Sequence, residues 1–196
     1  MARPRRISDA QIDAAARATF VAHGSSAPVA LVAERLGVSH AALLQRAGSK
    51  EKLLLRALEP GVFPLADQFA GAPPAKGAGG WLERLLRELL AFHEAMLPGM
   101  MVLRAAGLGS APSDGAQEPP TVLLRRLLKT WLRAATRMSS RRAGVVAEAL
   151  LGALEARCFN AYLGGPSFVT GTPARFVHDL VAQLVPELTF NRRRRP

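Results

Sequence analysis

The polar side chains between residues 39 and 50 are of the types that recognise nucleic acid. Gln45 and Arg46 can form paired hydrogen bonds with adenine and guanine edges, and arginine and lysine also bind phosphate. His40 and Lys50 lie on either side of them, whereas Ala41 could contact only a thymine methyl group. The alternative is a set of ordinary solvated residues. We expect that at least one of them contacts DNA.

Short helical segments must position these side chains. An apolar helical pattern over 28–36 ends at Gly37, and Ser39 can cap a second helix by accepting a backbone N–H. That helix stops at Gly48, and Ser49 can cap the next one. Two short helices joined by a tight glycine turn are typical of a helix-turn-helix, whose second helix enters the major groove. A purely structural corner is the alternative.

A further helix precedes this pair. Ser8, with Gln11 three residues later, forms a capping-box pattern, and the helix is expected to end near His23. Before it lies a basic arm that can enter the minor groove or remain a disordered cationic terminus: Arg3, Arg5 and Arg6. Residues 1–58 hold nine Lys and Arg against four Asp and Glu, a surplus that suits phosphate contact.

The composition favours an all-α protein. The chain has 196 residues, 49% of them hydrophobic, which is enough to form a sizeable core. Alanine, leucine and arginine outnumber valine and isoleucine, which favours helix over sheet. The net charge of +11 suggests nucleic acid, a membrane surface or acidic ligands as partners. Arginine-rich chains are also encoded by GC-rich genomes, which weakens this inference.

Several classes of protein are disfavoured. Cys158 is the only cysteine, so neither a disulfide framework nor a thiolate metal site is expected, and a reducing compartment is favoured. The four histidines lack ligand spacing, and we find no nucleophile elbow, phosphate loop or paired carboxylates. No stretch approaches the roughly 18 uninterrupted apolar residues that would span a membrane. We therefore expect a cytoplasmic protein that is not an enzyme and has no cofactor or metal.

Glycine and proline divide the chain. We expect a helix-turn-helix DNA-binding domain over 1–58, a larger helical ligand-binding and dimerisation domain over 59–190, and a disordered basic tail over 191–196. The larger domain is expected to contain helices over 81–97, 122–138, 142–163 and 172–188. Pro98-Gly99 should interrupt the first of these before a short helix to Leu108, and 109–120 should form a loop.

The helix over 122–138 is strongly basic. Its polar positions are all positive: Arg125, Arg126, Lys129, Arg133 and Arg137. A basic amphipathic helix can lie on a membrane. We favour a solvent-exposed face, with the apolar face in the core: Leu124, Leu127, Leu128, Trp131 and Leu132.

At this point the sequence resembles the TetR family of bacterial transcriptional regulators. The resemblance runs through ISDAQIDAAARATFVAHG and VALVAERLGVSHAALLQRAGSKEKLL, and covers about residues 7–58. It implies a homodimer whose two recognition helices bind a near-palindromic operator in double-stranded DNA, and whose larger domain releases the DNA when a small molecule binds.

The match has two departures. The family commonly has tyrosine at the position of Leu44, where its hydroxyl contacts phosphate, and often phenylalanine at the position of Ala47. Lys50 matches the family's phosphate-binding lysine, and Arg46 can partly replace the lost hydroxyl. The expected DNA-binding residues are Arg3, Arg5, Arg6, Pro28, Val29, Ser39, His40, Ala41, Gln45, Arg46 and Lys50.

Aromatic, methionine and isolated polar residues of the larger domain can line a cavity for a small apolar ligand. The candidates are Trp81, Phe92, His93, Met96, Met100, Arg104, Trp131, Phe159 and Tyr162. Most such residues could equally belong to the core. For the dimer interface, the last two helices offer Leu150, Leu154, Phe176, Leu180 and Leu184.

Two functions remain open. The favoured one is a ligand-responsive transcriptional regulator, a repressor that binds its operator as a homodimer and does not use a membrane. The alternative is a TetR-like helical dimer without specific DNA binding, which acts as a small-molecule-binding or interaction module. Leu44 and Ala47 motivate that alternative.

Overall fold

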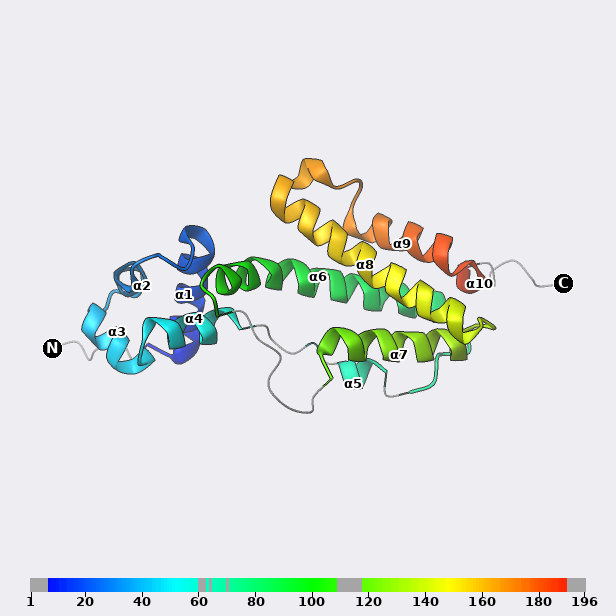
Figure 1. The fold of residues 1–196 in the computed structure, drawn as a ribbon, viewed down its shortest axis with the longest axis horizontal. Helices are drawn as coiled ribbons and strands as arrows, with labels where there is room; N and C mark the ends of the chain where they lie inside the picture. The colour runs from blue at the N-terminus through cyan, green and yellow to red at the C-terminus, as the bar shows by residue number, and fades with distance from the viewer. Residues whose placement is uncertain (1–6, 60–62, 64, 70, 109–117, 190–196) are drawn as a thin grey trace. The chain divides into compact units, whose positions relative to one another are not determined.

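The computed structural model describes residues 7–59, 63, 65–69, 71–108 and 118–189, and the secondary structure in these ranges is entirely helical, as predicted (Figure 1). The chain divides into two compact units. The first, which we call the head, comprises Met1–Gly61 and Met96–Ala111; the second, which we call the body, comprises Val62–Ala95 and Pro112–Pro196. The sequence-based division at residue 58 had placed 96–111 in the larger domain, whereas chain contacts group this segment with the head.

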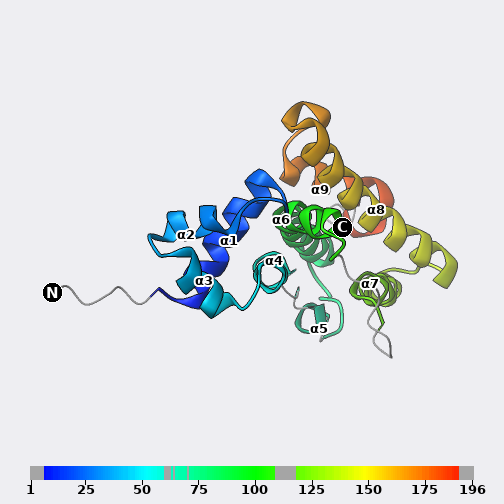
Figure 2. The same ribbon diagram turned by 60° about the vertical axis from the view of Figure 1, so that its left-hand side comes forward.

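Four short helices begin the head (Figure 2): α1 Asp9–His23, α2 Val29–Leu36, α3 His40–Ala47 and α4 Lys50–Leu58. The expected capping box is present at α1, where the Gln11 amide donates to the Ser8 hydroxyl at 3.2 Å and the Ser8 amide donates to Gln11 Oε1 at 2.8 Å. Gly37 closes α2 at a φ of 67°, a left-handed conformation that glycine adopts without strain. The two helices and the glycine turn of the expected helix-turn-helix are thus confirmed.

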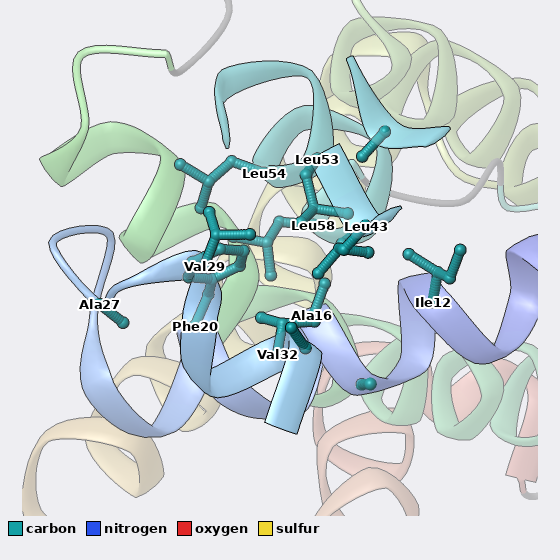
Figure 3. Close-up of a cluster of buried hydrophobic side chains, with 14 of the residues drawn as sticks. Ile12, Ala16, Phe20, Ala27, Val29, Val32, Leu43, Leu53, Leu54 and Leu58 are labelled. Carbon is teal, nitrogen blue, oxygen red and sulfur yellow. The ribbon is translucent and has the colours of Figure 1, made fainter. Parts of the chain in front are cut away.

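The head is built around a single apolar cluster (Figure 3). Phe20 of α1, Val32 of α2, Leu43 of α3 and Leu53 of α4 are buried in it, and Figure 3 shows their side chains converging with those of neighbouring apolar residues. Leu103, from the segment 96–111, belongs to the same cluster. This packing fixes which face of each short helix points inward, because helices of this length are marginal without tertiary contacts.

The described body contains longer helices. Their bounds are α5 Leu65–Gln68, α6 Ala78–Ala105, α7 Pro120–Ala135, α8 Ser140–Gly164, η1 Pro166–Phe168, α9 Pro173–Leu184 and α10 Pro186–Thr189, with the C-terminal part of α6 grouped in the head. The short helix α5 was not expected from the sequence. The single closing helix predicted over 172–188 is instead two helices, because Val185 leaves the helical conformation and Pro186 starts a new one.

One prediction about α6 was wrong. Pro98 lies inside a continuous helix and does not interrupt it. At the next residue, Gly99, a Cβ atom would lie 3.2 Å from the carbonyl oxygen of Leu58 and 3.2 Å from Arg17 Nη1. Residue 99 is therefore a point of close backbone approach within the head, which a glycine permits.

Helix α7 buries its apolar face in the body. Leu124, Leu128, Trp131 and Leu132 are buried, and α7 packs along α8. This confirms the interpretation of a basic solvent-facing helix on an apolar core, but the helix ends at Ala135 and not at 138, so Arg137 lies beyond it. Within the described residues, no helix is both long enough and apolar enough to cross a membrane.

Candidate functional site

Helix α3 turns one face to the core and the other to solvent. Leu43 is 2% exposed and Ala47 is 7% exposed, so both lie in the head's apolar cluster. The other face exposes His40, Ala41 and Gln45. The exposed Ser39 caps the helix, and its hydroxyl accepts the Ala42 amide hydrogen at 3.2 Å. This cap and the inward-facing Leu43 together fix the direction in which the polar side chains project.

Arg46 is exposed but already has protein partners. Its Nε lies 2.9 Å from Asp9 Oδ1, and its Nη1 donates to the carbonyl of Ile7. Both contacts join the end of α3 to the start of α1. The sequence did not indicate this ion pair, because the two residues are distant along the chain. To bind a DNA phosphate, as expected from the sequence, Arg46 would have to give up its ion pair with the carboxylate of Asp9.

Lys50 is the first residue of α4 and is partly exposed. Ser49 caps this helix, its hydroxyl accepting the Lys52 amide hydrogen at 3.1 Å. Gly48 makes the turn between α3 and α4 with a φ of 82°. The turn therefore places Lys50 directly after the polar face of α3, with no carboxylate partner among the residues that the structure describes.

The remaining predicted DNA-binding residues divide into three groups. Pro28 is exposed and precedes α2 as its N-cap, rather than lying in the first turn. Val29 is buried at 6% exposure in the core of the head, so a DNA contact by its side chain stays a prediction without structural support. Arg3, Arg5 and Arg6 lie outside the described residues.

The two departures from the TetR pattern have structural counterparts. Leu44 is half-buried and packs against the apolar cluster of the head, which a leucine side chain can do without a polar partner. Ala47 is buried without a large side chain, and the core around it is completed by neighbours such as Leu43 and Leu53. The core of the head is therefore compatible with both substitutions.

The predicted ligand-lining residues fall in both units. Met96, Met100 and Arg104 belong to the head, and the others belong to the body. In the body, Trp81 stacks on the buried Trp131 with ring centroids 4.5 Å apart. Phe159 and Tyr162 are 43% and 44% exposed, so they are not enclosed within the body, and their contact with a ligand stays a prediction. They lie on the outward face of α8, which periodicity alone did not separate from the inward one.

His93 is the most unusual of these candidates. Its Nδ1 is buried and has no hydrogen-bond partner among the described residues. Burial lowers the pKa of His93, and the nearby negative charge of Glu155 partly opposes the shift. The ring of Phe92, the preceding residue, packs edge-to-face with Phe63 at 5.4 Å. The surroundings of His93 thus combine apolar rings with one unsatisfied polar atom.

Two of the five predicted dimer contacts need correction. Leu150 and Leu154 are both 0% exposed, so they are core residues of the protomer. Phe176 is half-buried under the guanidinium of Arg157, whose central carbon lies 4.9 Å from the ring centroid, and Leu180 and Leu184 are half-buried. The sequence pattern correctly identified an apolar helix over 142–163 but not which of its apolar faces is buried.

Arg157 is a structural residue that the sequence did not reveal. It is 6% exposed, although it lies in a run that otherwise indicates buried apolar helix. Its two terminal nitrogens donate to the carbonyls of Thr170 and Gly171, each at 2.9 Å. The guanidinium therefore fixes the connection between α8 and α9.

Comparison with known proteins identifies the head. Residues 12–57 match the family described as "Bacterial regulatory proteins, tetR family". No curated protein sequence matches the chain. A TetR-like transcriptional regulator from Rhodococcus sp. RHA1 is similar in structure, with a TM-score of 0.62 and 21% identity over 97% of this chain and 100% of that one. A tetR-family transcriptional regulator from Streptomyces coelicolor has a TM-score of 0.53 and 19% identity over 89% of this chain and 77% of that one.

These similarities support different statements. At such low sequence identity, the two solved structures show a shared fold alone, an all-helical chain with the head at its N-terminus. The family match concerns the head itself and covers α2, α3 and α4 completely. Because the family consists of regulatory proteins, the expectation that the chain is not an enzyme is borne out. Residues 12–57 match the tetR family of bacterial regulatory proteins, and the chain as a whole shares its fold with solved regulators of that type.

Proposed function

We propose that the chain is a ligand-responsive repressor that binds a near-palindromic operator as a homodimer. The observation that carries this proposal is the exposed polar face of α3, with His40 and Gln45 opposite the buried Leu43. In this proposal 1–58 supplies the DNA-binding domain, and 59–190 supplies ligand binding and dimerisation.

We assign base reading to Gln45 and phosphate binding to Lys50. Gln45 is exposed near the middle of the outward face of α3, where an amide can pair with adenine. Lys50 follows immediately after the helix and has no carboxylate partner in the part of the chain that the structure describes. Ser39, His40 and Arg46 contribute further contacts. For Arg46 the contact requires that the ion pair with Asp9 opens.

We assign dimerisation to the outward face of α8. Residues at a spacing of three and four along this helix are apolar or small and all exposed: Val145, Ala149, Gly152, Ala156, Phe159 and Leu163. Leu163 alone is 74% exposed. Small residues let a second copy of the helix approach closely, and one stripe facing its own symmetry mate is the arrangement that a two-fold axis requires. This stripe replaces Leu150 and Leu154 as the proposed contact.

We assign the effector to the class of small apolar molecules. The support is the aromatic surroundings of His93, whose buried Nδ1 could orient one polar group of such a ligand. The residues that support this assignment all belong to the body.

Selection of random duplexes on the immobilised full-length protein tests the DNA-binding part. We expect an enriched near-palindrome whose affinity falls steeply with salt. Lys50→Ala should weaken binding to every duplex similarly and reduce the salt slope by about one, whereas Gln45→Ala should relax the preference at one base position and leave the slope unchanged. Lys76→Ala, which removes one exposed positive charge from the body, is the matched control.

The alternative function makes the opposite prediction. If the head has lost specific recognition, as the apolar Leu44 allows, no motif is enriched at moderate salt and Gln45→Ala has no base-specific effect. That outcome would favour a small-molecule-binding or interaction module.

A further inference from the structure

A hollow of about 470 Å³ lies on the body between α7 and α8. Six of the residues that line it are charged: Glu118, Arg125, Arg126, Lys129, Arg141 and Glu148. Four of these are cations and two are carboxylates. The hollow is open to solvent, so a ligand bound there would remain partly exposed. Val145 of the proposed dimer stripe also lines the hollow, but none of the six charged residues is assigned above to DNA, ligand or dimer contacts.

The two carboxylates are already paired. Arg126 Nη2 lies 2.8 Å from Glu118 Oε2, and the same guanidinium also donates through Nε, so the contact is two-pronged. This hydrogen bonding lowers the pKa of Glu118, which keeps the carboxylate charged. Arg125 Nη1 lies 3.5 Å from Glu148 Oε1. Each of these pairs contributes no net charge to the hollow.

Lys129 and Arg141 remain without a carboxylate partner in the described part of the chain. They come from different helices, Lys129 from α7 and Arg141 from the first turn of α8. Both line the same hollow, together with Gly144. A Cβ atom on Gly144 would lie 3.8 Å from Lys129 Cδ and Cε, so the lysine stem extends across the face of α8. The hollow therefore has two uncompensated positive charges, one from each of its walls.

We propose that this hollow binds a small phosphorylated molecule, whose phosphate is held by Lys129 and Arg141. A phosphate monoester carries a charge of about −1.5 to −2 near neutral pH, which matches two free cations. Arginine can bind such a group through two parallel hydrogen bonds, and lysine adds a point charge. The site goes beyond the proposed repressor function, and its ligand differs in class from the apolar effector.

The same features disfavour larger polyanions. A continuous phosphate backbone would need more free cations than Lys129 and Arg141, because Glu118 and Glu148 already neutralise Arg126 and Arg125. A membrane needs an apolar face to insert, but the apolar face of α7 is buried in the body, including Leu128 and Leu132 at 0% exposure. A compact anion needs neither a long row of free cations nor an exposed apolar face. Its phosphate would lie between Lys129 and Arg141, and the rest of the molecule would contact the two ion pairs.

Calorimetric titration of the full-length protein with pyrophosphate, at constant ionic strength, tests this proposal. We expect saturable binding with one site per chain. Lys129→Gln and Arg141→Gln should each weaken it by about tenfold, the loss expected for one charged hydrogen-bonded contact. Both side chains are on the surface of the body, so we expect thermal unfolding of the variants to match the wild type.

Two variants separate the site from the general positive charge of the protein. Arg133→Gln removes one exposed cation from the same helix outside the hollow, and Lys52→Gln removes one from the head at a residue with no assigned role. Both should bind pyrophosphate as the wild type does. An absence of saturable binding, or an equal loss in Arg133→Gln and Lys129→Gln, would overturn the proposal.

A co-sedimentation experiment with lipid vesicles distinguishes binding of a free phosphorylated molecule from binding of a lipid headgroup. Phosphatidylcholine vesicles with and without phosphatidic acid are sedimented with the wild type and with Lys129→Gln. We expect no difference in binding between the two proteins. Lysine-dependent sedimentation with phosphatidic acid, together with no binding of pyrophosphate, would reject the small-molecule assignment in favour of a lipid.

Discussion

The outward faces of α3 and α8 differ in chemistry, although both helices bury an opposite apolar face. The exposed side of α3 carries polar or small residues, among them His40 and Gln45. Its polar groups are satisfied by hydrogen bonds to water or to a polar partner. The exposed side of α8 includes Phe159 and Leu163, which cost free energy while they face water. The difference indicates that a polar partner suits the first helix and an apolar partner, such as a second copy of the chain, suits the second.

The difference also concerns how each face is fixed. Helix α3 is short, so its cap at Ser39 and the single inward Leu43 suffice to orient it. Helix α8 runs from Ser140 to Gly164 and carries apolar residues around most of its circumference. Only packing against α7 and α9 decides which of those residues are buried.

The largest effect is expected on α8. Phe159→Asp combined with Leu163→Asp should raise the dimer dissociation constant by at least about a hundredfold, because a two-fold axis places each charge in the apolar contact twice. Sedimentation velocity over a range of protein concentrations measures this. Operator affinity should fall with it, since each half-site would then be bound separately. The control is Thr121→Asp combined with Thr130→Asp, which adds the same charge to exposed positions of α7.

Two results would contradict this prediction: a monomeric wild-type chain, or dissociation of the α7 control as readily as the α8 variant. Either would show that the apolar exposed face of α8 is not a dimer contact.

A gain of function is expected on α3. Leu44→Tyr should raise operator affinity by about threefold to tenfold, because its hydroxyl can donate one hydrogen bond to a phosphate. The salt slope should not change, since the hydroxyl is neutral and releases no counterion. Fluorescence anisotropy with a labelled operator measures both quantities. Leu44→Phe supplies the ring without the hydroxyl, and an equal gain in that variant would attribute the effect to packing.

A smaller effect is expected from the ion pair at the edge of the same surface. Asp9→Asn should release Arg46, raise operator affinity by about two- to fivefold and steepen the salt slope by about one. Asp13→Asn removes the same charge from the same helix, but Asp13 pairs with Arg56 at 2.6 Å instead. Identical changes in the two variants would mean that net charge alone is responsible.

The smallest effect is expected in the core of the body. The pKa of His93 lies below its ordinary value of 6.5, so the unfolded chain binds a proton more readily than the folded one. Its contribution to stability is present above pH 6.5 and is lost as the pH falls through the lower, folded-state pKa. Chemical denaturation as a function of pH should therefore show a shallower decline for His93→Gln than for wild type.

Values measured near pH 8, where the histidine is neutral in both states, provide the reference for this comparison. Parallel curves for the two proteins over the acidic range would show that protonation of His93 does not affect folding.

The sequence by itself determined the elements of the head. The capping box at Ser8, the glycine turn at Gly37 and the caps at Ser39 and Ser49 are all present as predicted. Each of these signals acts over three or four residues, so it is complete within a short stretch of sequence. The family resemblance over this segment rests on the same local pattern, and the match at 12–57 confirms it.

Tertiary structure decided what depends on distant residues. Helix α6 continues through Pro98, and the next residue, Gly99, lies close to the backbone of Leu58. Arg46 forms an ion pair with Asp9, which is distant in sequence. The inward and outward apolar faces of α8 were likewise indistinguishable in sequence, since leucine and phenylalanine suit a protomer core and a subunit contact equally well. Burial is a property of the folded neighbourhood, and periodicity specifies only that a face is apolar, not which surface covers it.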